Sequence, residues 1–210
     1  MKLNDESKTE TKTVTIMAPD DAEDEMRTIG IVGDIDEEKC AEMLYSLIIL
    51  QKSAKVIVPK DPDDLDAGVT QIVRPIEFII STCGGSADEM FALYDMMRNV
   101  QGDCDIITRG LGKVMSAGVL LLAAGTKGKR EIGKYCRVMI HSVIAGNAGS
   151  FHNLENEMEE VRNTQEQYIK ALVSETGMTT RQLKKMLERK VNIYLTSQEA
   201  VELGIADIII

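Results

Sequence analysis

Three features of the sequence predict an α/β fold built from repeated strand–helix units. Short stretches rich in Ile and Val alternate with helical segments, the connections between them are short, and glycines stand where strands are expected to end. The chain has 210 residues, 44% of them apolar and 28% charged, which is typical of one folded globular domain. We expect this domain to span residues 27–210, after a mobile N-terminal arm over residues 1–26 that carries a short β-like patch.

The first unit is a strand that starts after Arg27 and leads through an acidic turn into a helix. The helix is indicated by apolar side chains at helical spacing, which should form one buried face: Cys40, Met43, Leu44, Leu47 and Ile48. Residues 59–73 follow, and their PKDPDDLDAG segment packs two prolines, a glycine and four aspartates between apolar β-like stretches. We expect a solvated loop there, because proline, glycine and aspartate favour turns.

The second unit is the strand Pro75–Ser81, which runs into Cys83-Gly84-Gly85 and a helix. Ser86 and Glu89 have the spacing of a capping box, so this helix should begin at Ser86.

The third unit is a strand over Asp105–Thr108 that ends at two glycines, after which Ser116 opens the segment AGVLLLAAG. This segment is apolar on every side and therefore predicts a helix buried in the centre of the domain.

The last third of the chain predicts the short strand RVMIH, a long helix over Leu154–Thr176 and two shorter helices. Thr179 with Gln182, and Thr196 with Glu199, should form the capping boxes of the shorter helices, and Gly204 ends the second of them.

The charge balance and the cysteine pattern exclude several classes of protein. The 24 basic and 34 acidic residues leave a net charge of -10, which disfavours nucleic acid as a partner. We find no secretory signal, and no apolar run approaches the ~20 residues of a membrane helix, so we expect a cytoplasmic protein that does not bind membranes. The four cysteines have no metal-ligand spacing and should be reduced and buried, so the sequence implies neither a metal nor a cofactor.

Ser116 and His141 are the candidates for nucleophilic chemistry. Ser116 stands at a helix start, where unpaired N–H groups and the helix dipole favour negative charge, although serine at such a position most often only caps the helix. His141 ends an apolar strand, and only His152, in a polar helix start, competes with it as a base. The backbone N–H groups of Gly84, Gly85 and Ala117 are candidates for oxyanion donors, or the glycines serve only a tight turn.

Four segments, in order, resemble the motifs of one family, the proteolytic subunit of the Clp protease. They are STCGGSADEMFALYDMMR, VMSAGVLLLAAGTKGKR, RVMIH and LTSQEAVELGIAD, and the resemblance spans Arg27–Ile210. It implies a crotonase-like α/β fold with a protruding handle helix at about residues 146–176. It also implies that Ser116 is the nucleophile of a serine endopeptidase, that His141 is its base, and that the N–H groups of Ala117 and the glycine pair form the oxyanion hole.

The sequence departs from the family pattern at the third position of the catalytic triad. Counting back from LTSQEAVELGIAD, the family's aspartate corresponds to Asn192, whose amide can accept a hydrogen bond from imidazole but cannot offset its positive charge. We therefore expect a slow peptidase, or another carboxylate in this role. Cys83 replaces the family's proline, Val191 an arginine that often precedes the aspartate, and residues 59–73 have no counterpart in the usual pattern.

The resemblance also implies an assembly and its partners. Two stacked heptameric rings, a tetradecamer of this chain, would enclose a chamber that degrades unfolded polypeptides. A hexameric Clp-type ATPase would feed them, since the chain has no phosphate-binding glycine loop. Two other functions remain as alternatives: a catalytically silent ring subunit that assembles with an active paralogue, which Asn192 favours, and an acyl-CoA enzyme of the crotonase superfamily, which would not need Ser116 and His141.

Overall fold

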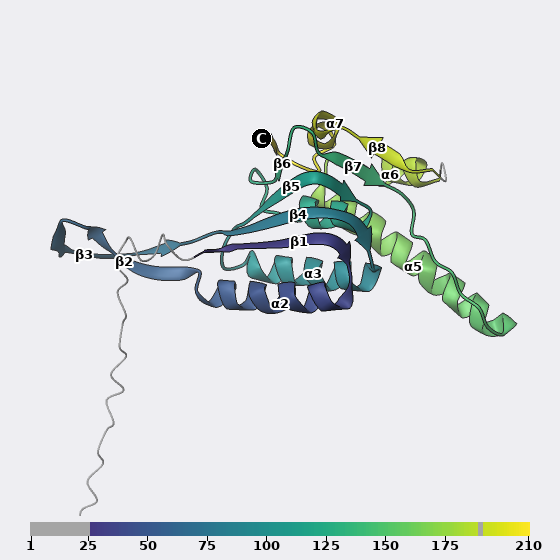
Figure 1. The fold of residues 1–210 in the computed structure, drawn as a ribbon, viewed down its shortest axis with the longest axis horizontal. Coiled ribbons are helices and arrows are strands. Elements are labelled where there is room, and N and C mark those ends of the chain that lie inside the picture. The colour runs from purple at the N-terminus through teal and green to yellow at the C-terminus, as the bar shows by residue number, and fades with distance from the viewer. Residues whose placement is uncertain (1–25, 189–190) are drawn as a thin grey trace, which may run out of the picture.

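The computed structural model of the chain describes residues 26–188 and 191–210, so nearly all of the arm expected at residues 1–26 lies outside the described part. Figure 1 shows a twisted sheet with α2 and α3 on one side, the hairpin β2–β3 at one end and α5 extending away at the other. The fold class expected from the sequence, α/β, is confirmed.

The described residues form nine strands and six helices. The strands are β1 (Thr28–Ile35), β2 (Lys55–Asp61), β3 (Asp64–Val73), β4 (Ile76–Gly85), β5 (Ile106–Met115), β6 (Glu131–Ile132), β7 (Arg137–Ile140), β8 (Ile193–Leu195) and β9 (Ile208–Ile209). The helices are α2 (Glu37–Lys52), α3 (Ala87–Val100), α4 (Ala117–Ala123), α5 (Phe151–Glu175), α6 (Thr180–Leu187) and α7 (Ser197–Glu202).

Seven of these strands form one mixed sheet. Its main path is β1-β4-β5-β6-β9, and β7 pairs with the second half of β5. All of these pairs are parallel, whereas β8 pairs with β7 in the antiparallel direction. The carboxyl ends of β4, β5 and β7 therefore meet at one edge of the sheet, the usual place for a site in an open parallel sheet.

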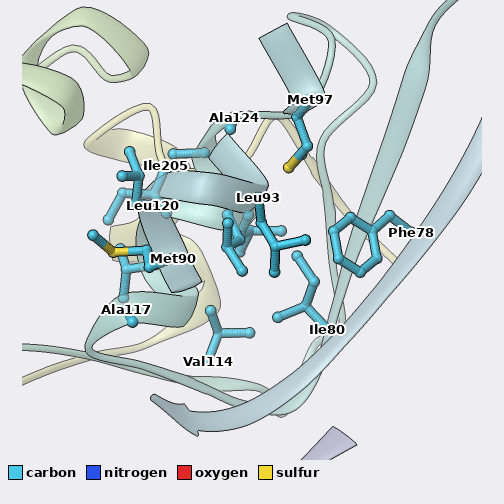
Figure 2. Close-up of a cluster of buried hydrophobic side chains, with 14 of the residues drawn as sticks. Phe78, Ile80, Met90, Leu93, Met97, Val114, Ala117, Leu120, Ala124 and Ile205 are labelled. Atoms are coloured by element: carbon cyan, nitrogen blue, oxygen red, sulfur yellow. The ribbon is translucent and has the colours of Figure 1, made fainter. Parts of the chain in front are cut away.

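The core lies between this sheet and its helices, with α4 at its centre (Figure 2). All seven residues of α4 are buried, as the apolar segment predicted. The close packing depends on Gly118, where a Cβ atom would lie 2.3 Å from Cγ2 of Thr82 on β4. Any larger side chain there would push α4 away from the sheet, and α4 begins directly after Ser116.

Residues 59–73 are not the loop expected from the sequence. They form most of an antiparallel hairpin, β2–β3, whose pairs run from Lys55 with Val73 to Asp61 with Asp64. The expectation was wrong because the aspartates and prolines of the PKDPDDLDAG segment mark the turn and its edges, while the flanking apolar residues alternate as strands do. Val56 and Val58 are buried in a small cluster of their own, separate from the main core.

The capping boxes of α6 and α7 form as predicted, but the one expected at Ser86 does not. In a capping box, the backbone N–H of the N-cap residue donates to the side chain three residues later. The N–H of Ser86 instead donates to the carbonyl of Ile35 at 2.9 Å, so Glu89 has no donor to bind. Pairing between β1 and β4 thus overrides the local capping signal.

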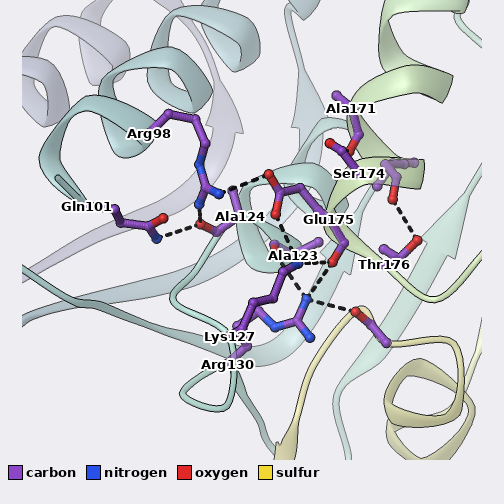
Figure 3. A network of polar contacts seen from close by, with 12 residues as sticks. Arg98, Gln101, Ala123, Ala124, Lys127, Arg130, Ala171, Ser174, Glu175 and Thr176 are labelled. Atoms are coloured by element: carbon purple, nitrogen blue, oxygen red, sulfur yellow. Dashed lines mark hydrogen bonds and ion pairs between the residues drawn. The ribbon is translucent and has the colours of Figure 1, made fainter.

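A buried polar network ties the end of α5 to the rest of the domain (Figure 3). The side chain of Glu175 is only 5% exposed and lies 3.0 Å from Arg98 on α3 and 2.9 Å from Lys127 after α4. The hydroxyl of Tyr94 donates to the same carboxylate at 2.8 Å. Arg130 donates to the backbone carbonyl of Glu175 at 2.7 Å, so the charges are paired rather than isolated in the interior.

Three of the four cysteines are buried and free, as expected, but Cys83 is exposed. It lies near the end of β4 and lines the cavity described below. Burial raises the pKa of the Cys136 thiol to about 11, which keeps it protonated. Within the described residues, none of the helices combines the length and the apolar character needed to cross a membrane.

Candidate active site

A cavity of about 350 Å³ opens at the sheet edge where β4, β5 and β7 end. Its walls come from the end of β4 (Cys83, Gly85, Ser86), the start of α4 (Ser116, Ala117), the stretch after β7 (residues 141–144) and α5 (Thr164, Tyr168). Both candidate residues for nucleophilic chemistry, Ser116 and His141, therefore face one cavity.

Ser116 occupies a strained turn between β5 and α4. Its φ of +54° is the only positive value at a non-glycine residue in the described part of the chain. The backbone N–H of Ser116 donates to the carbonyl of Met139 at 2.8 Å, and its side chain makes no capping hydrogen bond to α4. Strain of this kind persists where the surroundings over-determine the conformation, and here the hydroxyl faces the cavity instead of capping the helix.

Gly84 makes room for this turn. A Cβ atom at Gly84 would lie 2.6 Å from Cβ of Ser116, and its φ of +106° also favours glycine. The glycine is therefore required by the close approach of β4 to Ser116.

His141 is the candidate base that lies against Ser116. Its Nε2 lies 2.7 Å from Oγ of Ser116, so the hydroxyl can donate to the neutral ring. Burial lowers the pKa of His141, which favours the neutral imidazole able to accept a proton. His152, the competing candidate, is 89% exposed, and its Nδ1 lies 3.3 Å from Oε2 of Glu155 on the same helix.

The three expected oxyanion donors differ in their availability. The N–H of Gly84 donates to the hydroxyl of Thr82 at 2.9 Å and is therefore occupied. Gly85 and Ala117 both line the cavity, and Ala117 is the first residue of α4, where N–H groups have no acceptor within the helix. These two residues are the better candidates for stabilising an oxyanion.

Asn192 lies opposite His141 but does not bind it. The antiparallel register pairs Met139 with Tyr194 and Ile140 with Ile193, so one further step brings His141 opposite Asn192. The amide side chain is exposed, and no hydrogen bond joins it to His141 among the described residues. Within the described part of the chain, the ring's hydrogen bond is therefore the one through Nε2.

The sequence did not predict the contacts of two residues at the site, Tyr168 and Gln165. The hydroxyl of Tyr168 donates to the carbonyl of Ser116 at 3.1 Å, and Oε1 of Gln165 accepts the N–H of Val143 at 2.7 Å. In the sequence they appear only as members of the helical pattern of α5. Their contacts join segments far apart in the chain, so no local signal could have revealed them.

Comparison with known proteins identifies the family of the chain. Residues 68–210 match the profile of the Clp protease family, which is more than half of the chain and includes Ser116, His141 and Asn192. The chain belongs to the Clp protease family. It is 30% identical over 184 residues to the ATP-dependent Clp protease proteolytic subunit 1 of Corynebacterium jeikeium, an alignment that covers 88% of this chain and 87% of that protein.

A second relative in the Clp protease family is the ATP-dependent Clp protease proteolytic subunit 2 of Corynebacterium glutamicum. It is 34% identical over 184 residues, with 88% of this chain and 81% of the relative covered. The family membership that the four motifs indicated is thus confirmed over most of the chain.

Proposed function

We propose that this chain is the serine endopeptidase subunit of a self-compartmentalising Clp protease, with Ser116 as nucleophile and His141 as general base. The observation that carries the proposal is the 2.7 Å contact between Oγ of Ser116 and Nε2 of His141, made on a strained turn that faces a cavity. Serine at a helix start often caps the helix through its hydroxyl, whereas the hydroxyl of Ser116 contacts His141.

In the proposed reaction, the neutral ring of His141 takes the hydroxyl proton while Oγ of Ser116 attacks a peptide carbonyl. The N–H groups of Ala117 and Gly85 stabilise the tetrahedral oxyanion. His141 returns the proton to the departing amine, and the acyl-enzyme forms. A water molecule, deprotonated by the same ring, then attacks the ester and releases the second product.

Asn192 should make this peptidase slow. The imidazolium formed in the first step has no carboxylate opposite it, and the amide of Asn192 is not hydrogen-bonded to Nδ1. In the chymotrypsin-type triad, replacing the aspartate by asparagine lowers turnover by ~10⁴. The same feature favours a second candidate function, a catalytically silent ring subunit that assembles with an active paralogue.

We further infer two stacked heptameric rings that receive unfolded polypeptides from a hexameric Clp-type ATPase in the cytoplasm. The relatives are named as proteolytic subunits of an ATP-dependent protease, which supports a partner ATPase. Several large apolar side chains are exposed on α2 and α5, as subunit contacts would require: Tyr45, Ile49, Phe151 and Met158. The exposed first half of α5 suits a handle at about residues 146–176 of a crotonase-like domain spanning residues 27–210, with residues 1–26 as an axial arm.

The proposal is tested by labelling the assembled protein with a fluorophosphonate serine-hydrolase probe and measuring the intact mass. We expect one adduct per chain in the wild type and in Ser150→Ala, which changes an exposed serine outside the cavity. Ser116→Ala should lose the adduct. A folded and assembled wild type that gains no adduct would contradict the peptidase and support the silent subunit.

A further inference from the structure

We propose that Tyr168 is a positioning residue that fixes the peptide between Ser116 and Ala117 and so aims the oxyanion-binding N–H of Ala117 into the cavity. The inference rests on the proposed function, and it assigns the long helix α5 a part in the chemistry. Its basis is the 3.1 Å hydrogen bond from the hydroxyl of Tyr168 to the carbonyl oxygen of Ser116.

The geometry of the peptide bond links this contact to the oxyanion hole. A trans peptide is planar, and its C=O and N–H point in opposite directions. The carbonyl of Ser116 and the N–H of Ala117 belong to the same peptide, so holding the oxygen on the side of α5 directs the N–H away from α5. Ala117 lines the cavity, which is where a developing oxyanion would need that donor.

This peptide needs an external support because it follows a strained residue. Ser116 has φ +54° and ψ −122°, outside the regions that serine prefers. A rotation of the peptide would relieve this strain and turn the N–H out of the cavity. The carbonyl also accepts the N–H of Val119 at 3.0 Å, so Tyr168 supplies the second of its two hydrogen bonds.

Tyr168 is suited to this part by its burial. Its side chain is 5% exposed, and burial raises the pKa of the phenol, which therefore remains a donor. A buried tyrosine hydroxyl needs a partner, and among the described residues that partner is the carbonyl of Ser116. A donor on the carbonyl also polarises the peptide and strengthens its N–H as a donor in turn.

The same face of α5 holds the other side of the cavity. Gln165, one turn before Tyr168, accepts the N–H of Val143 at 2.7 Å and so fixes the stretch that follows His141. Helix α5 is therefore bonded to the segment after His141 through Gln165 and to Ser116 through Tyr168. These two bonds can fix the distance between Ser116 and His141.

The test compares Tyr168→Phe with Tyr94→Phe in the assembled protein. Both changes delete one hydroxyl that donates a hydrogen bond, but Tyr94 bonds Glu175, outside the cavity. We expect Tyr168→Phe to lower the rate of fluorophosphonate labelling about tenfold, which matches the loss of one buried hydrogen bond. Its affinity for a peptide boronic acid, whose adduct is a tetrahedral anion, should fall by a similar factor.

The pH at which labelling is half-maximal should stay unchanged in Tyr168→Phe, because His141 keeps its surroundings. Tyr94→Phe should lower the melting temperature but label like the wild type. If Tyr168→Phe labels at the wild-type rate, the inference about Tyr168 is wrong and the proposed function still stands. A shifted pH midpoint in Tyr168→Phe would also overturn the inference, because it would indicate that His141 had moved. A wild type that takes no label would overturn the proposed function and this inference together.

Discussion

At Ser116 a single residue combines backbone strain with a 2.7 Å contact to His141. The N–H of Ser116 donates to the carbonyl of Met139, and the carbonyl of Ser116 accepts the hydroxyl of Tyr168. Gly84 leaves room for the turn because it has no side chain. None of these three partners lies near Ser116 in the sequence. The hydroxyl is thereby presented to His141 without any capping bond that would have to be broken first.

Asn192 is the residue whose replacement should raise the activity of the proposed peptidase. Asn192→Asp introduces a carboxylate opposite His141, where it can stabilise the imidazolium. We expect the rate of peptide hydrolysis to rise at least about tenfold, a conservative fraction of the ~10⁴ effect of the reverse change in the chymotrypsin-type triad. The acid limb of the pH–rate profile should also move to higher pH, because a nearby carboxylate raises the pKa of histidine. Steady-state assays from pH 5 to pH 9 measure both effects.

Val191→Asp is the matched control for this change, since it adds the same charge one position away. It should leave the acid limb in place, because successive side chains of an extended segment point to opposite sides. An equal gain in both variants, or none in Asn192→Asp, would count against the account of Asn192.

The sequence allowed some residues of the site to be predicted and not others. Ser116 and His141 could be identified because each stands at a boundary between an apolar stretch and a polar one, in segments that resemble a family. The hydrogen bond that occupies the N–H of Gly84 could not be predicted, because it depends on the side-chain rotamer of Thr82 two residues earlier. The contact of Tyr168 with Ser116 could not either, since the two residues are 52 positions apart.

Among the elements, helices with a regular apolar pattern were the most predictable. The α4 segment is apolar on all sides and is wholly buried, and the capping pairs at Thr179 and Thr196 form as their spacing indicated. The hairpin β2–β3 was missed because its turn residues dominate the composition of the segment. The box at Ser86 was predicted wrongly because a strand pairing competes for the same N–H.

The hairpin β2–β3 should be separable from the part of the molecule that holds the candidate active site. Its base is closed by the hydrogen bond from the N–H of Arg74 to the carbonyl of Ala54 at 2.9 Å, and its buried residues form a cluster apart from the core. Replacing residues 55–73 by a short Gly-Ser linker keeps Ala54 and Arg74 in place. We expect the variant to fold and to take the fluorophosphonate label at the wild-type rate, with a melting temperature within a few degrees of the wild type.

Circular dichroism and intact-mass labelling test this expectation. A variant that assembles normally but labels at less than half the wild-type rate would contradict the independence of hairpin and site. A variant that fails to fold would show that β2–β3 contributes to the core after all.

On the scale of the whole molecule, the Glu175 network joins segments that the sheet does not. It brings α3, the segment after α4 and the end of α5 to one carboxylate, while Arg130 links the backbone of Glu175 to the C-terminal part of the chain through an ion pair with Asp207. The carboxylate itself is nearly inaccessible, whereas Arg98 is 34% and Lys127 52% exposed. Arg98 and Lys127 can each be solvated in part by water, but no other carboxylate among the described residues of this network pairs with them. Losing the charge of Glu175 should therefore cost more stability than losing either cation.

Glu175→Gln should consequently destabilise the fold. The amide keeps the shape of the side chain and can still accept the hydroxyl of Tyr94, but it leaves two cations without a counter-charge. Breaking a fully buried pair costs about 3–5 kcal/mol, and since both cations here can turn partly to water, we expect about 2 kcal/mol. Glu159→Gln, which removes the same charge from an exposed position of α5, should stay within about 0.5 kcal/mol of the wild type. Urea unfolding followed by circular dichroism gives both values, and equal stabilities of the two variants would mean that the network does not hold α5 to the domain.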